Sequence, residues 1–377
     1  IGCVIIAVIM AAVYYYFVEN RLAGLLCILL FSLFGDKYYY VRWAFALPFI
    51  LIVFSKKSVL ALAAHLENQG VRCSVIYGSL PPATRREQVR RFLERETEVV
   101  VSTDAIGMGL NLPIRRIVFV ETRKFDGTAR RSLLPEEIRQ IAGRAGRFGL
   151  YDEGFVTAID DIETIEDGLS ARPLPIMKAY VGFPEQLLNL PAEIDTLVKI
   201  WAGMEAPAIY EKMEVDELLS LYMSFERIHG DHLEEFTKQE IYKLITCSVD
   251  IDNRLVMDLW KDYCREYREV DELEFPYSPG TDLYDMESYY KMLDLYFQFS
   301  RKTGLPVQVE NLFHERRSTE EEISRILRTE CGSYTRKCSI CGRELSWDHP
   351  FSICERCFER GRSSQKRSRF HDQRYNH

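Results

Sequence analysis

The chain has 377 residues, of which 47% are apolar and 28% charged, and its net charge is −8. These values are ordinary for folded globular proteins, so they exclude a low-complexity or largely disordered chain. At roughly 100 to 200 residues per domain, the length predicts two or three domains. Because the net charge is acidic, the surface as a whole is not basic. Nucleic-acid binding would therefore require basic residues clustered in particular regions.

Basic residues are nevertheless concentrated in three stretches, which are residues 85–95, 115–131 and 362–374. The acidic excess lies mainly between residues 152 and 330. Each basic stretch is either a phosphate-binding surface or a solvated face with ion pairs, and both interpretations stay open.

The first 47 residues are unusually apolar. Residues 1–18 carry no charge, a second apolar run covers residues 22–35, and a third begins at Tyr38 and contains Arg42. Eighteen uncharged residues are about the minimum for a membrane span. Because the chain begins with Ile, we expect either a membrane hairpin or a non-native extension from a misread or truncated gene.

From Phe49 onward the pattern is that of an α/β domain. Short β-branched strands alternate with helical stretches, and Gly70 stands where a glycine commonly ends a helix. The predicted strands are residues 51–54, 71–77, 99–101 and 117–120, and the predicted helices are residues 57–69 and 83–95. This order predicts a parallel sheet with helices on both faces. A third membrane span over residues 38–54 is excluded, because residues 51–54 belong to that sheet.

Four prolines between residues 165 and 191 mark a linker or irregular connection. Beyond it, residues 192–327 place Leu, Tyr and Met at helical spacings, which predicts a helical region whose aromatic residues form its core.

The strongest functional pattern is the stretch of residues 140–149, QIAGRAGRFG. Arg144 and Arg147 are three residues apart and each follows a glycine, so both guanidinium groups can point to one side. Such a pair can stabilise the charge on a transferring γ-phosphate. The alternative for a bare pair of this spacing is a helix with surface ion pairs.

A second pattern covers residues 99–111, VVVSTDAIGMGLN. A buried strand delivers Thr103 and Asp104 to its carboxyl end, where open α/β sheets bind ligands, and Gly107 and Gly109 allow the backbone to approach a phosphate. The alternative is a helix cap that requires no ligand.

In this order, about 40 residues apart, the two patterns resemble motifs V and VI of superfamily-two helicases. Residues 50–56, ILIVFSK, resemble motif IV, and residues 77–82 and 123–127 match the segments expected after motifs IV and V. Together they are similar to DExH-type RNA helicases of the mitochondrial degradosome family and their bacterial relatives. The resemblance is specific over residues 49 to about 160, weaker over the helical region, and absent over residues 1–47.

The resemblance implies a role for each matching residue. Gln140, Arg144 and Arg147 face the γ-phosphate of ATP between two RecA-like domains, and Gly143 lies in the same motif. Thr103 and Ser79 contact the RNA backbone, while Asp104, Gly107 and Gly109 couple the RNA and ATP sites. Ile141 departs from the wider superfamily, in which many members have Arg at this position, so one polar contact is missing.

A larger departure concerns the first RecA-like domain, which in the family supplies a GxxxxGK[ST] phosphate loop and an acidic Mg²⁺ site. No Gly-Lys dipeptide occurs in these 377 residues, and the apolar segment stands where that domain is expected to end. We therefore expect the ATP site, with its Mg²⁺, to be shared with a domain that is not present here.

The C-terminus contains two CxxC pairs, Cys338 with Cys341 and Cys354 with Cys357, separated by twelve residues. Four thiolates in two close pairs predict a tetrahedral Zn²⁺ site, with disulfides or inert thiols as the alternative. Cys331 and His349 are spare donors nearby. The tail that follows is basic and carries Phe370 and Tyr375, so it is either an RNA-binding segment or a solubilising end.

These observations predict four parts: a hydrophobic segment (1–48), a second RecA-like helicase domain (49–165), a linker with a helical region (166–330), and a zinc knuckle with a basic tail (331–377). The predicted function is the C-terminal motor half of an ATP-dependent RNA helicase, inactive by itself, with a ribonuclease as a further partner implied by the resemblance. The alternative is a nonenzymatic RNA-binding or membrane-tethered adaptor. Dilute cysteines, four of them in CxxC pairs, predict a reducing, cytoplasmic location, with membrane anchoring through residues 1–47 left open.

Overall fold

The computed structural model describes residues 49–107, 112, 114–146, 153–172, 178–346, 349, 353–358 and 360. Internal contacts divide the chain into two units, each described by itself below. The first, the sheet unit, comprises residues 1–78, 86–171 and 330–377, and the second, the helical unit, comprises residues 79–85 and 172–329. The apolar runs before residue 48 and the basic tail after residue 360 lie outside the described residues. Among the residues that are described, no helix is both long and apolar enough to cross a membrane.

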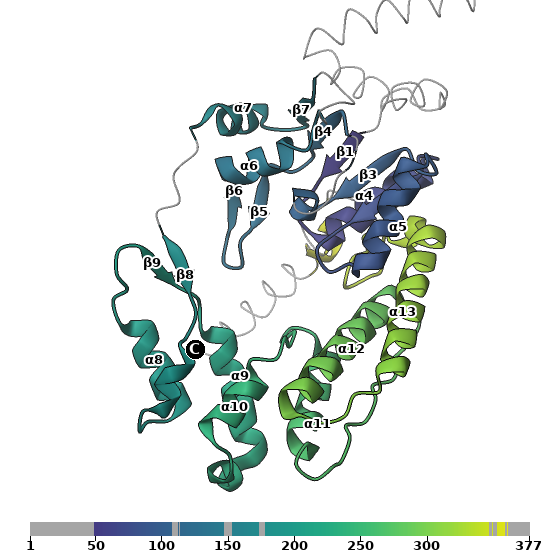
Figure 1. The fold of residues 1–377 in the computed structure, drawn as a ribbon. Coiled ribbons are helices and arrows are strands. Elements are labelled where there is room, and N and C mark those ends of the chain that lie inside the picture. Colours follow the sequence, from purple (N-terminus) through teal and green to yellow (C-terminus); the bar gives the residue numbers. More distant parts are fainter. Residues whose placement is uncertain are drawn as a thin grey trace, which may run out of the picture. The chain divides into compact units, whose positions relative to one another are not determined.

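Five parallel strands form the centre of the sheet unit in the order β2-β3-β1-β4-β7, with helices packed around them (Figure 1). The strands are β1 (Phe49–Ile52), β2 (Cys73–Ile76), β3 (Val99–Ser102), β4 (Arg116–Phe119) and β7 (Phe155–Ala158). The helices are α4 (Lys56–Asn68), α5 (Pro82–Leu93), α6 (Pro135–Ala142) and α7 (Ile162–Ser170), with a 3₁₀ turn η1 (Asp104–Gly107) after β3. The predicted parallel sheet is therefore confirmed.

Strand alternation explains why helices cover both faces of this sheet. Ile50 and Ile52 of β1 are fully buried in one cluster with Ile138 of α6 and Phe92 of α5. Helix α4 instead packs on β2 and β3, where it buries the segment from Val59 to Ala64. Successive side chains of a strand point to opposite faces, so a nearly continuous apolar strand is what a sheet buried on both faces requires.

Helix α4 has clear local signals at both ends. The hydroxyl of Ser55 accepts a hydrogen bond from the Ser58 backbone N–H at 2.9 Å, which caps the first turn. At the other end Gly70 has φ of +83°, and its N–H donates to the Glu67 carbonyl at 2.9 Å. This left-handed residue ends the helix as the sequence predicts, because glycine adopts positive φ without steric cost.

The sheet unit also contains a hairpin of β5 (Arg123–Phe125) and β6 (Arg130–Ser132). Asp126 closes the turn, since one of its carboxylate oxygens accepts hydrogen bonds from the backbone N–H groups of Thr128 and Ala129. Farther along the chain, η4 (Cys331–Ser333) packs against α4, and the Asn68 side-chain amide donates to the Gly332 carbonyl at 3.2 Å.

The helical unit has an aromatic core. Trp260, Tyr263, Phe225 and Phe299 are almost fully buried, and the Trp260 indole N–H donates to the Leu244 carbonyl at 3.1 Å. The predicted helical region and its aromatic core are thus present. Its elements are β8 (Ala179–Val181), η2 (Glu185–Asn189), α8 (Ile194–Gly203), β9 (Tyr210–Lys212), α9 (Asp216–His229), η3 (Gly230–Glu235), α10 (Lys238–Ile245), α11 (Arg254–Glu266), α12 (Leu283–Thr303) and α13 (Val309–Thr329).

Candidate functional site

The carboxyl ends of the parallel strands meet at one edge of the sheet, and polar residues gather there. After β4, the Glu121 carboxylate accepts a hydrogen bond from the Phe54 backbone N–H at 3.0 Å and another from the Ser58 hydroxyl at 3.0 Å. The loop between β1 and α4 is therefore fixed to the same edge that carries Thr103 and Asp104. Such an edge is where open α/β sheets place their ligands.

Thr103 follows β3 directly and is 7% exposed. Its hydroxyl oxygen accepts a hydrogen bond from the Ala105 backbone N–H at 3.2 Å, and its own N–H donates to the Ile76 carbonyl at 3.0 Å. The capping role considered from the sequence is thus present. This contact uses the oxygen as an acceptor, and no described residue accepts the hydroxyl proton.

Gly107 brings the two sequence patterns together. Arg144 donates to the Gly107 carbonyl oxygen through Nε at 3.1 Å and also through Nη2. A Cβ added at Gly107 would lie 3.2 Å from the Gln140 Cγ atom, closer than ordinary side-chain contacts. Gly107, Gln140 and Arg144 therefore form one packed contact between the end of β3 and α6.

The glycines of the second pattern differ in what they require. Gly143 ends α6 with ordinary helical dihedrals, whereas Gly146 has φ of +76°, and a Cβ there would lie 2.7 Å from the backbone nitrogen of Gly154. The lack of a side chain at Gly146 therefore makes room for the backbone of Gly154 in this same chain. Arg147 and Gly109 lie outside the described residues.

A chain of ion pairs joins this edge to the hairpin, and sequence reasoning missed it. The Lys124 ammonium group lies 3.3 Å from an Asp104 carboxylate oxygen and 2.6 Å from a Glu137 oxygen. Arg131 donates two hydrogen bonds of 2.9 Å to the same Glu137 carboxylate. Asp104 of the first pattern, the hairpin and α6 are therefore connected through charged groups.

These contacts set the electrostatics of the edge. Burial would raise the pKa of Glu137, but hydrogen bonds from Arg131, Lys124 and the Leu134 N–H outweigh it and lower the pKa to about 2. Burial likewise opposes the charge of Lys124, yet its pairs with Glu137 and Asp104 raise the pKa. Hydrogen bonds from Ala129 and Thr128 lower the pKa of Asp126 to about 2. All three groups are charged at neutral pH.

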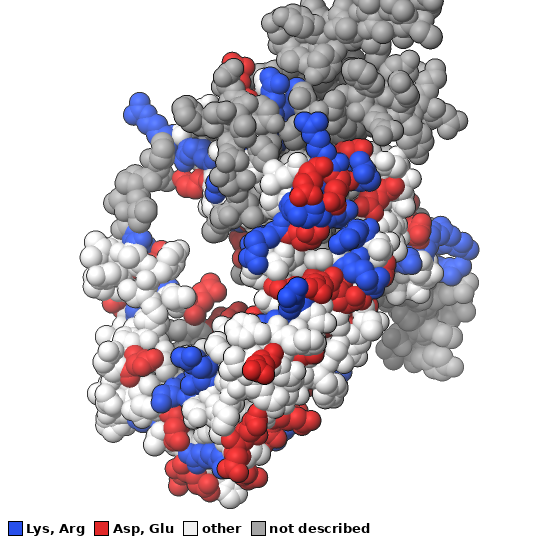
Figure 2. All heavy atoms as spheres, turned by 45° about the vertical axis from the view of Figure 1, so that its right-hand side comes forward, with Lys and Arg blue, Asp and Glu red and all other residues white. Residues whose placement is uncertain are grey.

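Ser79 and the Arg-rich stretch, which the sequence also singled out, do not take part in these contacts at the sheet edge. Ser79 is exposed in the turn after β2 and falls in the helical unit. On the face of the molecule drawn in Figure 2, positive and negative side chains are interspersed. In the Arg-rich helix α5, Arg90 is ion-paired with Glu87, Glu94 and Glu96. At Arg90 the ion-paired interpretation of the basic cluster therefore applies.

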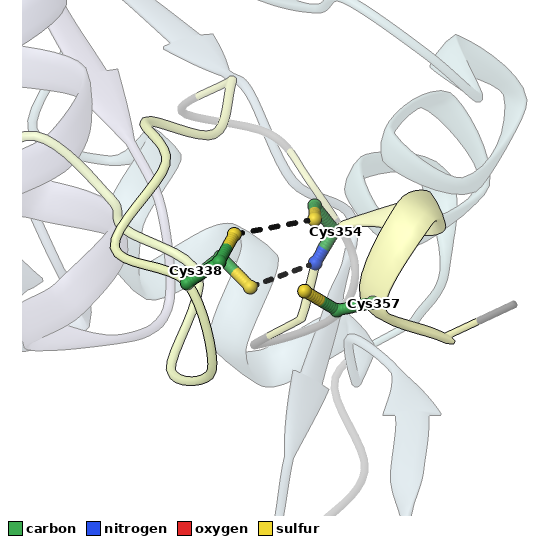
Figure 3. Close-up of side chains that lie close together, drawn as sticks. Cys338, Cys354 and Cys357 are labelled. Carbon is green, nitrogen blue, oxygen red and sulfur yellow. Dashed lines mark hydrogen bonds between the residues drawn. The ribbon is translucent and has the colours of Figure 1, made fainter. Parts of the chain in front are cut away.

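The four paired cysteines converge at the C-terminal part of the sheet unit, and Figure 3 labels Cys338, Cys354 and Cys357 among them. Their sulfur atoms all lie within 4.8 Å of one another, and the Cys341 and Cys354 sulfurs are 3.7 Å apart. A disulfide bond requires about 2.05 Å, whereas Zn–S bonds of about 2.3 Å in a tetrahedron place the sulfurs about 3.8 Å apart. The spacing fits a shared tetrahedral metal ion, and all four cysteines are free of disulfides.

The backbone around the sulfurs is also arranged as in a metal site, with N–H groups directed at a sulfur. The Cys354 N–H points at the Cys338 sulfur at 3.3 Å, and hydrogen bonds from backbone N–H groups lower the pKa of Cys338 to about 6. A side-chain hydrogen bond with Cys341 and burial raise the pKa of Cys357 to about 12. The Cys338 N–H donates to the Arg343 carbonyl at 2.8 Å, and the Gly342 N–H to the Cys338 carbonyl at 2.9 Å. Cys331 is buried against α4, and burial raises its pKa to about 12.

Residues 48–149 match the family described as "Helicase conserved C-terminal domain". The mitochondrial DExH-box ATP-dependent RNA helicase DExH16 of Arabidopsis thaliana is 33% identical over 270 residues, which cover 66% of this chain and 47% of that protein. The mitochondrial ATP-dependent RNA helicase SUV3 of Oryza sativa subsp. japonica is 44% identical over 140 residues, covering 36% of this chain and 24% of that protein.

An animal protein is similar over the same extent. The mitochondrial ATP-dependent RNA helicase SUPV3L1 of Danio rerio is 29% identical over 281 residues, covering 66% of this chain and 36% of that protein. This chain therefore spans less than half the length of these curated relatives. Among solved structures, domain 2 of the DEAD-box helicase Mss116p bound to an RNA duplex matches with a TM-score of 0.28 at 16% identity, covering 74% of this chain and 86% of that one.

Proposed function

The chain belongs to the superfamily-two DExH-type RNA helicases of the SUV3 kind, and from this premise we propose that it is the C-terminal motor half of an ATP-dependent RNA helicase. In this proposal residues 49–165 are the second RecA-like domain and residues 166–330 the linker and helical region. Residues 331–377 are a zinc knuckle with a basic tail. The remaining half of the ATP site belongs to a first RecA-like domain.

The contact of Arg144 and Gln140 with Gly107 carries the proposal. Arg144 has five N–H donors and uses two of them on the Gly107 carbonyl, and within the described residues the other three have no hydrogen-bond acceptor and can serve a γ-phosphate. A guanidinium held by backbone is already oriented when the nucleotide arrives, which is the condition under which an arginine finger acts. In the proposal Arg147 is the second arginine of the pair, Gly143 belongs to the same motif, and the first domain holds ATP with Mg²⁺.

The proposal assigns RNA contacts to Thr103 and Ser79. Thr103, at this edge of the sheet, can donate its hydroxyl proton to a phosphate, and Ser79 of the helical unit carries an exposed hydroxyl. Asp104 follows Thr103 directly and is linked to Glu137 of α6 through Lys124. Gly107, at the end of η1, accepts hydrogen bonds from Arg144 just beyond α6. When RNA binding displaces Thr103, these contacts transmit the movement to Arg144, which faces ATP. Gly109 belongs to the same segment.

We also propose one Zn²⁺ bound by Cys338, Cys341, Cys354 and Cys357. The donor set supports it, because four thiolates in a tetrahedron are a closed structural zinc site. Such thiols require a reducing compartment, and we propose the cytoplasm, although the curated relatives are named as mitochondrial proteins. A ribonuclease partner stays a prediction of the resemblance.

The proposal is tested by joining the chain to a first RecA-like domain and measuring steady-state ATP hydrolysis with and without single-stranded RNA. Arg144→Ala and Arg147→Ala are each expected to lower kcat on the order of 10³-fold, with RNA affinity almost unchanged, because a finger acts on a bound nucleotide. Arg72→Ala is the matched control, since Arg72 is an exposed arginine at the amino end of β2.

The isolated chain is expected to bind RNA without RNA-stimulated ATP hydrolysis. RNA-stimulated turnover by the isolated chain that vanishes in Arg144→Ala would contradict the proposed sharing of the ATP site. RNA binding by the joined protein without any ATP hydrolysis would instead favour the nonenzymatic adaptor.

A further inference from the structure

The zinc knuckle divides its large apolar side chains into two groups. Leu345 and Ile353 pack against the cysteine cluster, as the interior of a small metal module requires. Ile340 and Phe358 are instead 66% and 52% exposed. Each of the exposed pair is the chain neighbour of a sulfur ligand, Ile340 before Cys341 and Phe358 after Cys357.

Both exposed residues stand on backbone that the cluster fixes. The Phe358 N–H donates to the Cys354 carbonyl at 3.0 Å, and the Cys354 N–H donates to the Cys338 sulfur. The sulfurs of the two CxxC pairs lie within 4.8 Å of one another, so the turns carrying Ile340 and Phe358 meet at one point. Apolar side chains on a fixed backbone lose little conformational freedom when a ligand stacks on them.

The charge of this module is opposite to that of the rest of the chain. Residues 334–377 contain ten Lys or Arg and five Asp or Glu, whereas the whole chain has a net charge of −8. Four of these cations are exposed, and none forms a salt bridge with any residue in the described ranges: Lys337, Arg343, Arg356 and Arg360. The α5 arginine Arg90, by contrast, is surrounded by glutamates.

Exposed apolar side chains among cations favour one class of partner. Protein interfaces exclude charged residues from their apolar core, whereas single-stranded RNA offers base faces for stacking and, next to them, phosphates for Lys and Arg. Paired RNA does not present its base faces, because they are stacked within the helix. The combination on the knuckle therefore matches unpaired RNA.

We propose that the zinc knuckle is a second RNA-binding site of this chain, specific for unpaired nucleotides. Phe358 stacks on one base and Ile340 packs against a neighbouring one. Lys337, Arg343 and Arg356 hold the flanking phosphates, separately from the site at Thr103. This proposal rests on the proposed zinc binding, which keeps the two turns together.

The test measures the affinity of the full chain for a fluorescent oligouridine by anisotropy, together with zinc content by metal analysis. Phe358→Ser is expected to weaken binding about tenfold, since the stacking of one base on the ring is lost. Ile340→Ser is expected to weaken binding about threefold. Met223→Ser is the matched control, because Met223 on α9 is also 52% exposed, and its affinity should stay within twofold of the wild type.

A second pair of measurements separates stacking from charge. Arg356→Ser should reduce the slope of log affinity against log salt concentration by about 0.7, the value for one phosphate contact on a single strand. An unlabelled RNA duplex should compete much more weakly than unpaired RNA of the same length.

The outcomes distinguish this inference from the zinc proposal. Full zinc content with unchanged RNA affinity in Phe358→Ser and Ile340→Ser overturns the inference and leaves the zinc site standing. Wild-type protein without zinc overturns the zinc proposal itself. If Phe358→Ser loses its metal, the test rests on Arg356→Ser. An unchanged slope of log affinity against log salt concentration in that variant overturns the inference.

Discussion

The parallel sheet and the zinc knuckle belong to one structural unit, yet different forces hold them together. The sheet buries aliphatic side chains such as Ile50, Ile52 and Val100 completely. The knuckle buries mainly cysteines and has Leu345 and Ile353 as its apolar neighbours. Burial of large apolar side chains supplies the free energy of folding in the first region, whereas in the second we propose that metal–thiolate bonds supply it. The two regions should therefore respond to different perturbations.

The largest effect is expected from removing the metal. Cys354→Ser or a strong chelator should abolish zinc binding and make residues 334–360 sensitive to protease, because metal binding is folding free energy in such modules. The unfolding transition of the sheet should remain. Cys247→Ser is the control, since Cys247 is a buried thiol of the helical unit and its replacement should leave the zinc content unchanged. Loss of the sheet transition on chelation would show that the two regions are not independent.

The opposite perturbation is a cavity in the sheet. Ile52→Ala should lower the free energy of unfolding by about 2–5 kcal/mol, because Ile52 is fully buried in the central strand. Zinc content should stay at the wild-type value. Ile209→Ala provides the comparison, since Ile209 is 61% exposed and should change stability by less than about 0.5 kcal/mol. Chemical denaturation followed with metal analysis measures both quantities.

The smallest effect concerns the ion pairs at the sheet edge. The pKa of Glu137 is lowered from its ordinary value of 4.5 to about 2, so its contribution is complete above pH 4.5 and is lost as the pH falls through 2. Glu137→Gln should therefore cost about 1 kcal/mol at pH 7, a modest value because solvent screens the partly exposed pairs. The stability difference from the wild type should shrink between pH 4.5 and 2. A difference that is constant over this range would mean that the charge of Glu137 contributes nothing.

The sequence predicts those parts of the molecule whose signals are local. Ser55 and Gly70 mark both ends of α4, and the three valines of residues 99–101 lie in β3 as expected. The four cysteines converge because their spacing within each pair already fixes most of the geometry. The contact of Arg144 with Gly107 was not predicted, because the motifs assign a role to each residue but do not specify which side chain meets which backbone group.

The hairpin and its ion pairs were missed for a physical reason. The Asp126-Gly127 pair is a hairpin-turn signal, but each flanking strand has three residues, two of them basic in each case, and shows no apolar alternation. What stabilises this hairpin is Glu137, which lies on a different element and pairs with both Lys124 and Arg131. Periodicity cannot reveal a carboxylate that acts across the fold.

The central position of β1 has a consequence for synthesis of the protein. Both of its neighbours, β3 and β4, follow it in the chain by about 50 to 70 residues. At about 5–20 residues per second, a ribosome needs several seconds to deliver them. During that time the segment Phe49–Ile52 is an unpaired apolar strand of the kind that pairs with other chains. Newly made chains should therefore depend on a chaperone at this stage more than later, when the sheet has closed on both sides of β1.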